Sequence, residues 1–84
     1  MKDTTAYTTD DIEQVVLRAA EVALQTPRIR SQDDLHELGM DSLVATVIVA
    51  RVHRELAVDI PVRLLLEHPV AADFARAVAE RMAV

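Results

Sequence analysis

Residues Ser42 to Leu56 read SLVATVIVARVHREL, and the conformation of this stretch decides the fold class. Its valines and its isoleucine are β-branched, and this composition favours a strand by propensity alone. The stretch is nevertheless longer than an ordinary strand and contains neither glycine nor proline. Residues also recur at helical spacing, in the pairs Leu43/Val44, Val47/Ile48, Arg51/Val52 and Glu55/Leu56. The sequence therefore predicts a largely buried helix that begins at Asp41 or Ser42.

Another helix is predicted upstream of this stretch. Apolar side chains there follow the spacing of one helix face, at Ile12, Val15, Val16, Ala19, Ala20 and Ala23. Thr8 or Thr9 can serve as the N-cap, and the two aspartates that follow suit the positive end of the helix. Pro27 disfavours helical geometry at the residue before it and so ends the segment. Residues 1–8 are expected to form a flexible tail.

A long loop is predicted between these two helices. Residues from Arg28 to Asp41 show no sustained period and include Gly39, the only glycine of the chain. Long ordered loops in small domains tend to be functional. We expect Ile29, Leu35 and Leu38 to anchor this loop to the core.

Two prolines delimit the next element. Pro61 suits the first turn of a short helix over Val62 to Glu67, and Pro69 stops that helix. A last helix is marked by Phe74, Ala77, Val78 and Met82. Residues 1–84 are therefore expected to form one all-α domain, a small four-helix bundle with three long helices, a short third helix and a long first loop.

Composition excludes several classes of function. The 84 residues carry 9 Lys+Arg against 14 Asp+Glu, and a net charge of −5 argues against nucleic acid as a partner. There is no cysteine, and the three histidines are too far apart in sequence for a known metal motif. No stretch approaches the ~20 apolar residues of a membrane span, and the N-terminus has no signal-peptide core. We expect a monomeric cytoplasmic protein without a metal.

The segment LGMDSL, Leu38 to Leu43, places a serine at the predicted start of the second helix. Asp41 and Ser42 are both helix-capping residue types, so Ser42 can be a structural cap. A hydrolase needs a base beside the serine, but His53 would lie ~16 Å away along the same helix, and GMDSL is not a G-x-S-x-G elbow. The remaining possibility is a solvent-facing hydroxyl that accepts a phosphate-linked group at the positive helix end.

IRSQDDLHELGMDSL, from Ile29 to Leu43, resembles the attachment region of acyl and peptidyl carrier proteins, whose signature is LGxDSL. ELAVDIPVRLLLEHPVAADFARAV resembles their third and fourth helices, including the Glu-His-Pro run. The resemblance implies a non-catalytic protein in which Ser42 carries 4′-phosphopantetheine, donated from coenzyme A by a Mg²⁺-dependent phosphopantetheinyl transferase. It also implies turn freedom at Gly39, and at Asp41 a helix cap, a contact for the transferase, or both.

The class of carrier protein is inferred by comparing further residues of this sequence with the patterns of each class. The predicted second helix has only Glu55 as an acid, unlike the acidic helix of fatty-acid carriers. DDLHELGMDSL is similar to the nonribosomal-peptide pattern DxFFELGGDSL, although His36 and Met40 depart from it, and Val70 replaces the usual threonine after His-Pro. We expect a free-standing peptidyl carrier, with a polyketide or fatty-acid carrier as the alternative. A helical interaction domain in which Ser42 only caps a helix is the competing class.

The resemblance further implies which enzymes and which surface take part. The expected partners are an adenylation or acyltransferase loading enzyme and condensation, ketosynthase or thioesterase-type enzymes. They would approach the start of the second helix and the third helix beside it. Because acids are scarce there, we expect apolar side chains to carry much of the recognition. The expected contact residues are Met40, Leu43, Val44, Val62 and Arg63.

Overall fold

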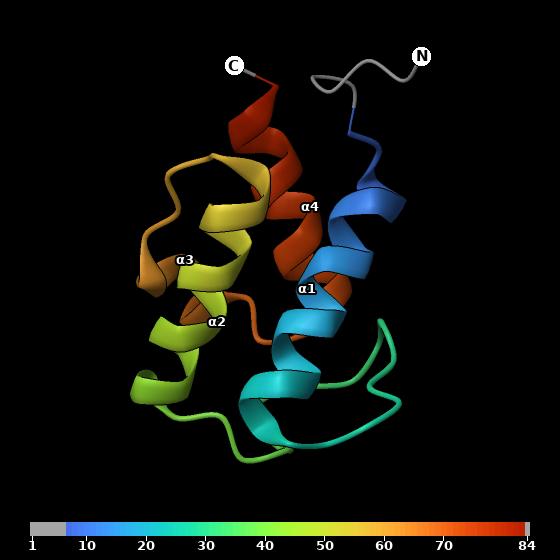
Figure 1. The fold of residues 1–84 in the computed structure, drawn as a ribbon, viewed down its shortest axis with the longest axis vertical. Helices are drawn as coiled ribbons and strands as arrows, with labels where there is room; N and C mark the ends of the chain where they lie inside the picture. The colour runs from blue at the N-terminus through green and yellow to red at the C-terminus, as the bar shows by residue number, and fades with distance from the viewer. Residues whose placement is uncertain (1–6, 84) are drawn as a thin grey trace.

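The computed structural model describes residues 7–83, and this part of the chain folds as four helices without a named strand (Figure 1). The helices are α1 (Thr9–Leu24), α2 (Ser42–Leu56), α3 (Val62–Glu67) and α4 (Ala71–Met82). The predicted all-α bundle with a short third helix is therefore confirmed. Most of the predicted N-terminal tail lies outside the described residues.

α1 begins with a reciprocal cap at Thr8. The Thr8 hydroxyl accepts from the Asp11 N–H at 3.1 Å, and an Asp11 carboxylate oxygen accepts from the Thr8 N–H at 3.0 Å. Of the two threonines considered, Thr8 is thus the cap. The helix ends at Leu24, where Gln25 adopts a left-handed conformation with φ 52°, two residues before Pro27.

α2 is a helix and not a strand because one of its faces fills the core. Its buried residues are spaced three or four apart: Ala45, Ile48, Val49, Val52 and Leu56. α1 packs against α2 and α4, and α3 packs against α2 and α4. The largest fully buried side chain is Phe74 of α4. Burial against these neighbours outweighs the strand propensity of the valines.

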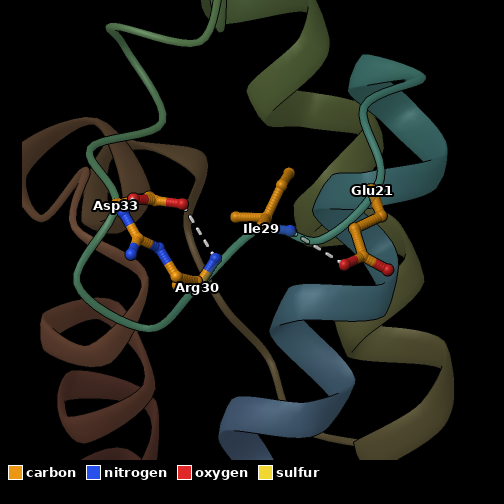
Figure 2. Close-up of polar contacts among 4 residues, drawn as sticks. All are labelled: Glu21, Ile29, Arg30 and Asp33. Atoms are coloured by element: carbon orange, nitrogen blue, oxygen red, sulfur yellow. Dashed lines mark hydrogen bonds and ion pairs between the residues drawn. The ribbon is translucent and has the colours of Figure 1, made fainter.

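The loop over residues 25–41 is ordered by hydrogen bonds to the helices on either side. Leu35 N–H donates to the Pro69 carbonyl at 2.9 Å, and Ala72 N–H donates to the Ser31 carbonyl at 2.8 Å. These bonds join the loop to the start of α4. A Glu21 carboxylate oxygen of α1 accepts from the Ile29 N–H at 3.0 Å (Figure 2).

The loop also stabilises itself locally. Asp33 accepts from the Arg30 N–H at 2.8 Å, as Figure 2 shows, and its other oxygen lies 3.4 Å from the Arg30 guanidinium. The Ser31 hydroxyl donates to Glu13 of α1 at 2.6 Å. Because polar groups of the loop are hydrogen-bonded to α1 and to the start of α4, this long segment is an ordered part of the fold.

Two of the three expected apolar anchors of the loop are confirmed. Ile29 is 5% exposed and Leu35 is fully buried, but Leu38 is 36% exposed. The expectation for Leu38 is wrong because successive turns follow Leu35, with the Leu38 N–H bonded to the Leu35 carbonyl at 3.1 Å. Leu35 occupies the core, and the turn leaves Leu38 at the surface.

α4 starts without a side-chain cap, because the residue after Pro69 is a valine. Val70 is the N-cap residue and makes no capping hydrogen bond through its side chain. All four residues that were predicted to mark this helix lie in it; Phe74 and Val78 are buried, and Ala77 and Met82 are half-buried. None of the helices described in residues 7–83 is long and apolar enough to cross a membrane.

The different burial of two loop leucines leads to a stability prediction. Leu35→Ala should lower the free energy of unfolding by about 2–5 kcal/mol, because it leaves a cavity in the core. Leu38→Ala, the matched control, should cost about 1 kcal/mol or less. Urea unfolding followed by circular dichroism measures both values. Similar losses in the two variants would contradict the anchoring role assigned to Leu35.

Candidate functional site

The buried side chain of Met40 anchors the start of α2 to the core. This side chain is 5% exposed and belongs to the buried core together with Leu35, whose carbonyl accepts the Met40 N–H at 3.0 Å. The expectation that Met40 contacts a partner enzyme is therefore not supported by its position. A flexible apolar side chain directly before an exposed helix start anchors that start to the core.

Gly39 makes the turn that leads into this anchor. Its φ is +107°, a conformation that side chains of L-residues rarely adopt, and a Cβ atom there would meet no other atom within 4 Å. The requirement for glycine is thus conformational and not steric. Gly39 allows the backbone to turn, and this turn sets the positions of Asp41 and Ser42.

Asp41 is the N-cap of α2. Its backbone is extended, with φ −113° and ψ −173°, and its Oδ1 accepts from the Val44 N–H at 2.9 Å. Of the two capping residue types at this helix start, the aspartate therefore takes the structural role. Its side chain remains exposed beside the serine.

Ser42 is the first residue of α2, and it is exposed. Within residues 7–83, its hydroxyl forms no hydrogen bond; only its carbonyl is used, accepting from the Thr46 hydroxyl at 2.9 Å. His53 cannot serve as its base, because eleven residues of helix separate them by ~16 Å. The hydroxyl is neither a cap nor an activated nucleophile, and it is open to solvent.

The surroundings of Ser42 suit a phosphodiester. The first backbone N–H groups of a helix have no acceptor inside that helix, and Asp41 satisfies only the one at Val44. Among residues 7–83 the N–H groups of Ser42 and Leu43 have no acceptor, and they lie at the positive end of the helix dipole. The residues present thus fit a phosphate group attached to the serine oxygen.

Apolar side chains lie on the surface beside this site. Leu43 is 73% exposed and Val47, one helical turn further, is 45% exposed. Sequence reasoning named Leu43 but missed Val47, although its spacing of four residues from Leu43 places both on one helix face. Val44, another expected contact residue, is half-buried and packs against the core.

The structure brings α3 to the side of α2, as expected. Val62 is half-buried and packs against the core, whereas Arg63 is exposed and lies 4.0 Å from Glu67 one turn along α3. The only acid of α2, Glu55, lies near its other end and 3.8 Å from Arg18 of α1. α2 therefore contributes no acid to the surface near Ser42, where the exposed carboxylate is that of Asp41 before the helix.

Comparisons with known proteins agree with this geometry. The family described as phosphopantetheine attachment site matches residues 10–78. Tyrocidine synthase 3 of Brevibacillus parabrevis is 35% identical over 74 residues, which are 86% of this chain and 1% of that protein. Gramicidin S synthase 2 of Brevibacillus brevis is 38% identical over 61 residues, 73% of this chain and 1% of that protein.

A polyketide synthase is also similar. Conidial pigment polyketide synthase alb1 of Aspergillus fumigatus is 35% identical over 51 residues, 61% of this chain and 2% of that protein. No solved structure matches the chain. The chain spans only about one hundredth of the length of the tyrocidine and gramicidin synthases it matches. From the family match over most of its residues, the chain belongs to the phosphopantetheine attachment site family, the carrier domains that bear a covalently attached 4′-phosphopantetheine.

Proposed function

We propose that this chain is a non-catalytic carrier of nonribosomal peptide assembly, with the phosphopantetheine arm attached to Ser42. One observation carries the proposal: Asp41 takes the capping role at α2, so that the neighbouring serine hydroxyl is exposed and forms no hydrogen bond within residues 7–83. A serine that only capped the helix would have its oxygen on a backbone N–H. This difference argues against the interaction domain in which Ser42 has no chemical role.

Attachment requires a separate phosphopantetheinyl transferase. The Ser42 oxygen forms a bond to the phosphorus of coenzyme A that bears the pantetheine, the diphosphate bond of coenzyme A breaks, and the adenosine bisphosphate part leaves. The serine proton passes to a base on the transferase. Asp41 places a carboxylate beside this reaction, where it can face the Mg²⁺ of the transferase while it holds the Val44 N–H.

Presentation of the cargo follows from the attachment point. When bound, the arm supplies the thiol on which acyl or aminoacyl groups are held as thioesters, in a chain that has no cysteine of its own. Ser42 lies at one end of α2, and Met40 and the ordered loop fix this end relative to the core. A fixed tether raises the effective concentration of the cargo at a partner's active site.

The similarity to tyrocidine and gramicidin synthases supports the peptidyl class, with adenylation and condensation enzymes as partners. The polyketide carrier remains the second candidate because a polyketide synthase is also similar, and it would pair with acyltransferase and ketosynthase enzymes. A cytoplasmic location is part of the proposal, because the loading reaction consumes coenzyme A. We also propose that the carrier acts as a monomer.

Partner enzymes are proposed to contact a surface made by Leu43 and Val47 of α2 and by Val62 and Arg63 of α3. Leu43 and Val47 are the exposed apolar side chains of α2 next to the attachment point. An interface of this kind depends on a few apolar anchors surrounded by polar residues. Met40 is left out of this surface because it is buried.

The assignment of Ser42 as the attachment point is tested with variants that distinguish loss of the arm from loss of stability. Ser42→Ala should take up no arm from coenzyme A and a promiscuous transferase, and it should unfold at nearly the wild-type temperature. Asp41→Ala should instead lower the free energy of unfolding by about 1 kcal/mol, while Asp41→Asn keeps most of the cap. Intact mass and thermal melts give both readouts. Loading of the Ser42→Ala variant would refute the assignment.

The contact surface is tested with a charge placed on it. Leu43→Glu and Val47→Glu should each reduce transfer of cargo from the loaded carrier about tenfold or more, since a lost interface anchor costs upward of ~2 kcal/mol. Val22→Glu on α1 is the matched control, because Val22 is 56% exposed and lies outside the proposed surface. It should leave transfer nearly unchanged.

The dependence of cargo transfer on ionic strength distinguishes apolar docking from electrostatic docking. Transfer by the wild-type carrier should change little between low and physiological ionic strength, because only exposed charge pairs are strongly screened. A collapse of transfer with salt, or a fall in melting temperature that accompanies each loss of transfer, would contradict the apolar surface.

A further inference from the structure

α3 has few interactions of its own that would hold it in place. The helix, Val62–Glu67, is six residues long, and its N-cap residue Pro61 makes no side-chain capping hydrogen bond. Leu65 is the one residue of this helix that is buried. Helices shorter than about 12 residues are marginal in water without tertiary contacts. The position of α3 therefore depends on the packing of Leu65 and on how the chain is held at the two ends of the helix.

The chain that leads into α3 is held by side chains from α2 and α4. Figure 1 shows this connection, residues 57–61, leaving one end of α2 and running back beside it. His53 of α2 donates from Nδ1 to the Val58 carbonyl at 2.8 Å. Arg81 of α4 donates from Nε to the Asp59 carbonyl at 3.1 Å. Among residues 7–83, these are the only side-chain hydrogen bonds to the connection.

Both bonds have defined donors. A carbonyl oxygen only accepts, so His53 Nδ1 carries the proton in its bond to Val58, and the Arg81 guanidinium is always protonated. The Asp59 carboxylate lies 3.8 Å from the same His53 nitrogen, but it is almost fully exposed, so this pair adds little. The chain before α3 is therefore held through its backbone carbonyls.

The two bonds lie close enough to α3 to set where the helix begins. Only Ile60 and Pro61 separate Asp59 from Val62, the first residue of α3. Ile60 packs against the core, and the ring of Pro61 restricts its φ, which is −72°. The chain consequently has little freedom between the bonded carbonyls and the start of the helix.

The other end of α3 is held by the backbone. Pro69, two residues after the helix ends, accepts through its carbonyl from the Leu35 N–H of the loop at 2.9 Å. Leu35 is itself fully buried, so this end is fixed to the core. The start of α3 is instead tied to the rest of the fold through His53 and Arg81.

We infer that His53 and Arg81 are positioning residues that set the place of α3 and of the part of the partner surface that α3 supplies; the inference rests on the proposed function. Val62 and Arg63, the residues of α3 in that surface, are the first two residues of the helix. His53 and Arg81 themselves are not part of that surface. A surface that is ordered before contact binds better than one that must be ordered on contact, so loosening the connection should weaken docking.

The role of the two donors is tested first on the unloaded protein by amide hydrogen exchange. Arg81→Met keeps a long apolar side chain without donors, and His53→Ala removes the ring. In both variants the amides of Leu66 and His68 should exchange about fivefold faster or more, the change expected from the loss of one hydrogen bond. The amide of Val16 should keep its wild-type rate, because α1 does not pack against α3.

Conservative and matched variants distinguish the donors from the bulk of the side chains. Arg81→Lys and His53→Asn each keep an N–H donor and should restore most of the protection in α3. Arg76→Met makes the same change on α4 at a guanidinium that bonds Asp73 of its own helix at 3.3 Å. Arg54→Ala truncates the exposed neighbour of His53 on α2. Both controls should exchange in α3 as the wild type does, and thermal melts verify that all variants are folded.

The consequence for docking is measured with the loaded carrier. The probe is an adenylation enzyme that aminoacylates the wild-type carrier. Arg81→Met and His53→Ala should raise its KM for the carrier about fivefold with little change in kcat, since docking is weakened and the chemistry at the arm thiol is not. Arg76→Met and Arg54→Ala should leave the KM nearly unchanged. Intact mass verifies that every variant carries the arm.

The outcomes distinguish this inference from the function on which it rests. Wild-type exchange in α3 of the Arg81→Met and His53→Ala variants would overturn the positioning role and leave the proposed function intact. An equal acceleration in α1 would also overturn it, because it indicates a general loss of stability. Faster exchange in α3 with an unchanged KM would overturn the role in docking. A wild-type chain that accepts no arm by intact mass would overturn the proposed function and the docking role together.

Discussion

The hydrogen bond from the Val44 N–H to Asp41 determines where α2 begins, and the function proposed for this protein depends on that position. A helix needs a cap at its start because its first N–H groups have no partner in the helix. Here the cap comes from the residue before the serine. The serine is therefore left inside the first turn with an exposed hydroxyl that forms no hydrogen bond in the part of the chain that the structure describes.

The position of the Asp41 cap depends on the segment before it, which is held in place by a turn and by buried side chains. Gly39 allows the turn, Met40 is buried under the helix start, and Leu35 fixes the loop in the core. Backbone hydrogen bonds then join the loop to the start of α4. A loop that carries no regular element is nevertheless ordered before the start of α2, because it is hydrogen-bonded to its neighbours and its side chains Ile29, Leu35 and Met40 are buried.

α2 divides its surface between the core and the solvent. One face is buried in the core, and another carries the exposed Leu43 and Val47. The helical period separates these faces although their residues alternate in the sequence. The face with Leu43 and Val47 stays outside the core and is the one that a partner enzyme is proposed to approach.

The sequence by itself determined the helices, because spacing, prolines and capping residues are local signals. The resemblance of LGMDSL to the carrier-protein signature LGxDSL also pointed to Ser42 as the proposed attachment residue. Only the tertiary structure decided which of Asp41 and Ser42 is the cap, because both residue types can fill that role. It also showed that Met40 is buried and Leu38 exposed, the reverse of what was expected. In a loop without a period, exposure depends on turns and on distant packing partners, and neither can be derived from the local order of residues.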